Sequence, residues 1–118
     1  MFRGTLSISV HAALELITAS ALIGAPFVLG LSLDATITAV VIGTVLFGLA
    51  ISATATEGRG TLPLSAHAAY DASIALVLVG AAIYFGVSGQ ATALGFLLAA
   101  GTAQLVLNAV TRYSPVRA

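Results

Sequence analysis

The chain of 118 residues lacks cysteine and lysine and carries very few charges of either sign. Without cysteine it can form neither disulfides nor thiolate metal sites, and without lysine it cannot hold retinal or pyridoxal phosphate as a Schiff base. Its formal net charge is zero, which excludes nucleic acid as a main partner because no basic field exists to neutralise phosphates. Charged residues make up only 7% of the chain, against about 25% in an ordinary soluble domain. So little polar surface cannot coat a soluble globule.

Apolar residues make up 59% of the chain and gather in long runs. A membrane-spanning helix needs about 20 mainly apolar residues, and four runs satisfy this length, over residues 6–31, 35–55, 62–87 and 91–110. The breaks at 32–34, 56–61 and 88–90 are short and hold polar and turn-forming residues, so successive helices should pack antiparallel. We therefore predict an all-α membrane protein, a bundle of four transmembrane helices with the lipid bilayer as its main partner.

The chain also contains an internal repeat. A shift of 56 residues aligns His11 with His67 and Glu15 with Asp71 without a gap, and 18 of the 56 aligned pairs are identical. We predict two tandem two-helix membrane repeats, residues 1–56 and 57–118, within one structural domain. Because each repeat holds two helices, both copies should enter the membrane in the same direction and be related by a pseudo-two-fold axis along its normal.

The arginines predict the orientation in the membrane. All four lie at one end of the expected helix array, and the opposite loops contain neither lysine nor arginine. The positive-inside rule then puts both termini and the middle loop in the cytoplasm. We expect a multi-pass protein of the cell inner membrane, oriented by Arg3, Arg59, Arg112 and Arg117.

Small residues recur every fourth position on two of the predicted helices. In lipid, helices associate through close approach at such residues, so we expect them to form helix contact faces within the bundle, with an interface between two copies of the chain as the alternative. The residues are Ala35, Ala39 and Gly43 on the second helix and Ala91, Gly95, Ala99 and Ala103 on the last.

Four ionisable residues fall inside predicted spans, where a central Asp costs about 2.5 to 3.5 kcal/mol. His11 and Glu15 are four residues apart, as are His67 and Asp71, so each pair lies on one helix face. Both faces should point inward, since a lipid-facing charge would have no partner. The repeat axis then brings the four residues together. We call them the quartet.

Four interpretations of the quartet are open. It can be a structural set of hydrogen bonds that joins the repeats, a relay for protons or small cations, or a chelate for a divalent metal. The fourth is a haem b held by His11 and His67, with Arg3 and Arg59 available to the propionates. Carboxylates one turn from each ligand argue against haem because they would need partners beside an apolar macrocycle.

Further polar residues are secondary candidates. Gln104 and Asn108 are four apart on the last helix and should form interhelical hydrogen bonds, with a substrate contact as the alternative. Tyr70 is next to Asp71 and can donate to a carboxylate or simply pack. Tyr84 and Tyr113 fit membrane-interface positions.

One stretch resembles a known family. Residues 25–32, Ala-Pro-Phe-Val-Leu-Gly-Leu-Ser, followed by Val-Val-Ile-Gly at 40–43, are similar to the two-helix SPW repeat of small bacterial membrane proteins. The Ser-Pro-Trp signature of that family corresponds to Ala-Pro-Phe at 25–27 and to Ala-Ala-Ile at 81–83. The resemblance implies a two-helix repeat architecture and no particular activity.

The chain shows no Ser-His-Asp arrangement, phosphate loop or nucleotide fingerprint, so we expect that it is not an enzyme. The quartet predicts an intramembrane site for a proton or small cation. The alternatives are an electron carrier with haem b or a divalent metal as cofactor, and a structural or interaction subunit of a membrane complex.

Overall fold

The computed structural model describes residues 6–54, 63–111 and 113. All four helices in these ranges are long and apolar enough to cross a membrane, so the predicted all-α membrane fold is confirmed. Each predicted run agrees with its helix to within two residues at either end. The helices are α1 (Ile8–Leu29), α2 (Leu33–Thr54), α3 (Leu64–Val87) and α4 (Ala91–Val110).

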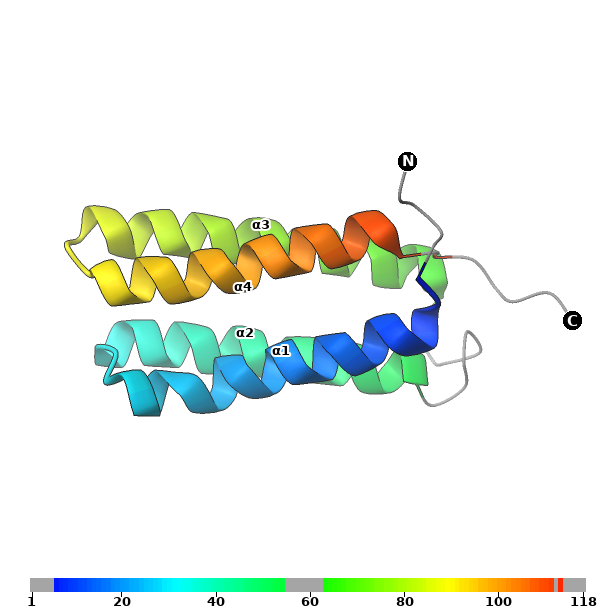
Figure 1. Ribbon diagram of the computed structural model, residues 1–118, viewed down its shortest axis with the longest axis horizontal. Helices are drawn as coiled ribbons and strands as arrows, with labels where there is room; N and C mark the ends of the chain where they lie inside the picture. The colour runs from blue at the N-terminus through cyan, green and yellow to red at the C-terminus, as the bar shows by residue number, and fades with distance from the viewer. Residues whose placement is uncertain (1–5, 55–62, 112, 114–118) are drawn as a thin grey trace, which may run out of the picture.

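The helices form two antiparallel hairpins that lie side by side (Figure 1). Helix α1 packs mainly against α2, and α3 packs mainly against α4, while contacts between the hairpins are fewer. We call the end where α1 and α3 begin the terminal end and the other the turn end. At the terminal end the Leu6 amide donates to the Val110 carbonyl at 2.9 Å, which joins the two hairpins.

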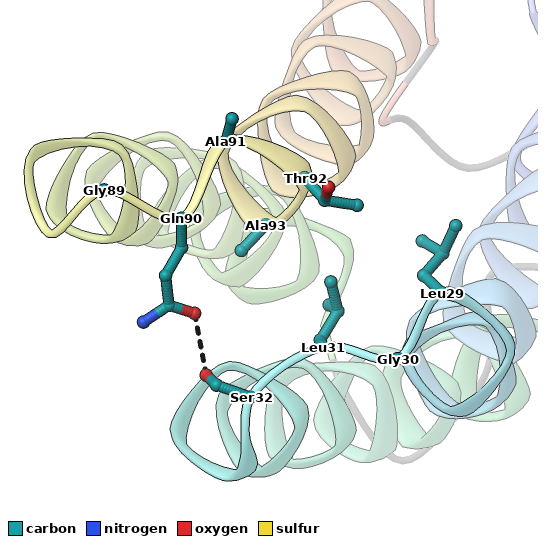
Figure 2. A pocket seen from close by; sticks show the side chains of 9 residues that line it. All are labelled: Leu29, Gly30, Leu31, Ser32, Gly89, Gln90, Ala91, Thr92 and Ala93. Atoms are coloured by element: carbon teal, nitrogen blue, oxygen red, sulfur yellow. Dashed lines mark hydrogen bonds between the residues drawn. The ribbon is translucent and has the colours of Figure 1, made fainter.

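Glycine closes both tight turns at the turn end. Gly30 has φ 64° and Gly89 has φ 86°, a left-handed conformation that glycine adopts at no steric cost. The two turns are joined by the Ser32 hydroxyl, which donates to Gln90 Oε1 at 2.7 Å (Figure 2). An open pocket of about 450 Å³ lies between them. The described residues that line it include no ionisable side chain. They lie in and beside the two turns, at the end of the bundle opposite the starts of α1 and α3.

Close helix approach occurs within each hairpin at a glycine. A Cβ on Gly43 would lie 2.8 Å from Leu22 Cβ and 3.0 Å from the Ala19 carbonyl oxygen. Within the second hairpin, a Cβ on Gly101 would lie 3.1 Å from Leu78 Cβ. The expected contact face of α2 is therefore present, and Ala35 and Ala39 on it are fully buried.

The prediction that the small residues of α4 form its contact face within the bundle is wrong. All four small residues of that stripe are exposed, and the buried face begins two positions along, about 200° around a helix of 3.6 residues per turn. Gln104 and Gly101 account for the difference, since Gln104 has polar partners inside the bundle and Gly101 allows the close contact with α3. The buried residues of α4 are Ala93, Leu97, Gly101, Gln104 and Leu107.

Two glycines of α2 provide a matched test of this packing. Gly43→Ala should lower the free energy of unfolding by about 1 to 3 kcal/mol, because the new methyl group meets backbone and a Cβ that cannot move aside cheaply. Gly48→Ala should leave stability unchanged or slightly increased, since nothing lies within 4 Å of the position that its methyl group would take. Thermal unfolding in detergent, followed by circular dichroism, would measure both. Equal effects of the two substitutions would contradict the packing described.

Candidate functional site

The structure brings the quartet together inside the bundle at the terminal end. His11 and His67 are each the fourth residue of their helix, and Glu15 and Asp71 follow one turn later. All four side chains are at most 1% exposed. Because α1 and α3 run in the same direction from the same end (Figure 1), equal positions along them lie at equal depth.

Each imidazole of the quartet reaches both carboxylates. His11 Nε2 lies 3.0 Å from Glu15 Oε2 on its own helix and 2.9 Å from Asp71 Oδ2 on α3. His67 Nε2 lies 3.2 Å from Asp71 Oδ2 and 3.4 Å from Glu15 Oε1. These crossed contacts join the two hairpins. The imidazole rings themselves meet edge to face, with centroids 5.9 Å apart.

Several buried atoms of the quartet nevertheless lack a hydrogen bond. His67 Nε2 is near two carboxylate oxygens, but neither contact has hydrogen-bond geometry. Glu15 Oε1 and Asp71 Oδ1 are also buried without a hydrogen-bond partner among the described residues. Buried polar atoms in native proteins are nearly always paired, with protein or with ordered water, so these three atoms mark a place where a small polar or charged species can be bound.

Polar groups from α4 and the residues after it surround the quartet. The Gln104 amide donates to Glu15 Oε2 at 2.8 Å, and the Tyr113 hydroxyl donates to Asp71 Oδ2 at 2.7 Å. Asn108 Oδ1 accepts from the Gln104 amide at 3.0 Å and lies 3.1 Å from the Tyr113 hydroxyl oxygen. Each carboxylate therefore has one oriented donor of its own.

The contacts of Thr111 determine how His11 is protonated. Its hydroxyl donates to the Leu107 carbonyl at 2.6 Å, so its oxygen accepts from His11 Nδ1, also at 2.6 Å. With a proton on Nδ1, a neutral His11 would turn the lone pair of Nε2 toward two carboxylates. Either a second proton or a cation is therefore required between Nε2 and the carboxylate oxygens.

A count of charges gives the same result. Two carboxylates with two neutral imidazoles leave a charge of −2 in a fully buried cluster, which is very costly in an apolar interior. Two protons on the imidazoles or one divalent cation would neutralise it. The arrangement is built to hold positive charge.

Tyr113 covers the quartet at the terminal end. Its ring packs against the small apolar cluster formed by Ile8, Ala12 and Leu64, and its hydroxyl lies 3.3 Å from His11 Nε2 as well as contacting Asp71. Burial and the nearby Asp71 carboxylate raise the pKa of Tyr113 well above its ordinary value. The phenol therefore stays protonated and remains a donor at physiological pH.

The secondary candidates have different outcomes. Gln104 and Asn108 lie beside the quartet, and Gln104 forms the interhelical hydrogen bond expected of it, to Glu15. Tyr70 is 53% exposed, and the tyrosine that donates to Asp71 is Tyr113, for which the sequence suggested only an interface position. Thr111 was not singled out from the sequence, because nothing in its spacing relates it to His11. Arg3 and Arg59, considered for haem propionates, lie outside the described residues.

The chain matches no protein-family model, no curated protein and no solved structure. The resemblance to the SPW repeat and the internal duplication thus stay predictions from the sequence. The geometry of the quartet is therefore what bears on the function of the protein.

The raised pKa of Tyr113 has a measurable consequence. A free tyrosine ionises at about pH 10. In the folded protein the phenolate absorption of Tyr113 should therefore not appear at that pH. Folding favours the phenol, so the free energy of unfolding should be insensitive to this group below about pH 10 and should fall above it. Alkaline absorbance titrations of the wild type and of Tyr113→Phe, subtracted from one another, would isolate the contribution of this residue. A difference spectrum with ordinary tyrosine titration would contradict the buried contact with Asp71.

Proposed function

We propose that the protein is a small polytopic membrane protein whose quartet binds and exchanges a proton or small cation. The observation that carries this proposal is the position of His11 Nε2, within 3.0 Å of an oxygen of both Glu15 and Asp71 while Nδ1 bonds to Thr111. A proton or a cation must lie between these atoms. The proposal involves no catalytic step, in keeping with the expectation that the chain is not an enzyme.

A purely structural quartet is the main alternative, because the crossed contacts hold the hairpins together. Exchange is supported over this alternative by the incomplete pairing of the cluster. A set of hydrogen bonds kept only for stability would be expected to satisfy its buried members, whereas His67 Nε2 and one oxygen of each carboxylate have no hydrogen bond within the described part of the chain.

The haem alternative fits this geometry less well. Oxygens of Glu15 and Asp71 lie within 3.4 Å of the imidazole Nε2 atoms. A flat macrocycle between His11 and His67 would have to displace both carboxylates into apolar surroundings, where they would need new partners.

Replacing one carboxylate tests the exchange. In liposomes carrying the protein and an internal pH indicator, Glu15→Gln should reduce proton flux driven by a pH gradient to the rate of protein-free vesicles, because glutamine keeps the shape but cannot carry the proton. Asp34→Asn is the matched control. It removes an exposed carboxylate at the turn end and should leave the rate unchanged.

Two results would contradict the exchange. One is wild-type flux no greater than that of empty vesicles. The other is an unaltered rate in Glu15→Gln. If His11→Ala lowers the unfolding temperature while flux is unchanged, the quartet has only its structural role.

We also propose that the protein lies in the cell inner membrane with both termini in the cytoplasm. This orientation is based on the arginines, all of which lie outside the described residues. Since the chain has no cysteine, single engineered thiols can test it. Asp34→Cys at the turn end should react with an impermeant maleimide added to intact cells, and Pro63→Cys, exposed at the terminal end, should react only after the membrane is permeabilised. The reverse pattern would invert the orientation.

A further inference from the structure

We propose that the cation bound by the quartet is a divalent transition-metal ion of the zinc class, held by His11, His67, Glu15 and Asp71. This inference depends on the proposed function, since it names the chemical class of the cation. Its four ligands come in two matched pairs from α1 and α3, so the ion would lie between the two hairpins.

The distances agree with a four-coordinate site. One nitrogen or oxygen atom from each of the four residues lies within 4.8 Å of all the others. Zinc bonds of about 2.0 to 2.2 Å in a tetrahedron place neighbouring ligand atoms about 3.3 to 3.6 Å apart. The observed separations between imidazole nitrogens and carboxylate oxygens are 2.9 to 3.4 Å. Outward shifts of a few tenths of an ångström at these pairs, together with closure of any pair that lies as far apart as 4.8 Å, would admit the ion.

The atoms without hydrogen bonds are the second observation, independent of the clustering. His67 Nε2, Glu15 Oε1 and Asp71 Oδ1 are buried and have no hydrogen-bond partner among the described residues, and all three are atoms that coordinate zinc. The hydrogen bonds of the cluster leave these atoms unpaired, whereas a metal ion can take them as ligands.

The residues around the quartet already form the hydrogen bonds that usually orient metal-ligating side chains. A ligating histidine usually donates its other ring nitrogen to an oxygen, as His11 Nδ1 does to Thr111. Ligating carboxylates are in turn hydrogen-bonded, as Glu15 is by Gln104 and Asp71 by Tyr113. Three of the four ligands are thus oriented in advance.

Charge and ligand type select the ion. A monovalent cation with two neutral imidazoles would leave the cluster at −1, whereas a divalent ion makes it neutral. Magnesium and calcium prefer sites made wholly of oxygen, and copper(I) prefers sulfur ligands. Two imidazoles with two carboxylates suit zinc and its first-row neighbours.

Metal binding can be measured on the full chain, purified in detergent without an oligohistidine tag. Isothermal titration with Zn²⁺ should give saturable binding of one ion per chain, and Mg²⁺ should give none. Co²⁺ should produce the intense visible absorption of a tetrahedral site, and Zn²⁺ should raise the unfolding temperature of the wild type because it binds only the folded protein. This last measurement needs no variant.

Two ligand variants and one control localise the site. His67→Gln and Asp71→Asn should each weaken Zn²⁺ binding by at least about tenfold, since each removes a direct ligand. Asp34→Asn, which removes a carboxylate at the other end of the molecule, should bind Zn²⁺ like the wild type. Circular dichroism would confirm that each variant is helical.

Absence of Zn²⁺ binding by helical wild-type protein would overturn the proposal, and so would binding that both ligand variants retain. The flux assay separates this failure from failure of the proposed function. If Zn²⁺ does not bind but Glu15→Gln still abolishes proton flux, the occupant is the proton and the proposed function stands. If neither is observed, both proposals are wrong.

Discussion

The structure depends on one constraint, that two carboxylates lie fully buried in an apolar bundle. Glu15 and Asp71 can be accommodated only because each meets an imidazole of its own helix and one of the other. Lipid-exposed helices have no hydrophobic reason to associate, and the hairpins share fewer contacts with each other than their helices share within each hairpin. The crossed contacts therefore join the hairpins inside the bundle, in addition to the hydrogen bonds at its two ends, and they form the site that we propose to be functional.

The site is less symmetric than the sequence pattern of the quartet. Its outer polar contacts come from α4 and the residues after it, namely Gln104, Thr111 and Tyr113. After the 56-residue shift, Gln104 aligns with Gly48 of α2, which has no side chain to make such a contact. Asn108, which bonds to Gln104, aligns with Ser52, which bonds to the Leu49 carbonyl. Glu15 and Asp71 therefore differ in their donors, an amide for one and a phenol for the other. The two carboxylates therefore lie in chemically distinct surroundings.

The sequence predicts the helices and the quartet well because both are set by strong local constraints. Crossing a membrane requires about 20 apolar residues, which limits helix bounds to within a residue or two. A spacing of four residues then places Glu15 on the same helix face as His11, and Asp71 on the same helix face as His67. In contrast, the buried face of α4 was not predictable from its small residues. The lipid-facing side of a membrane helix is as apolar as the side inside the bundle, so hydrophobicity does not distinguish the two. The contacts of Thr111 and Tyr113 were missed because both residues lie beyond the last helix, where spacing along the chain no longer reports which side chains meet.

The depth of the quartet has a consequence for electrical behaviour. Glu15 lies seven positions beyond the first residue of α1, which is about 10 Å at 1.5 Å per residue, in a helix about 33 Å long. A cation that reaches the carboxylates from the terminal end would thus cross about a third of the span, and one leaving toward the turn end would cross the rest. Each elementary charge gains or loses about 2.3 kcal/mol per 100 mV over the full membrane. A membrane voltage would therefore act about twice as strongly on the step between the quartet and the turn end as on occupancy from the terminal end.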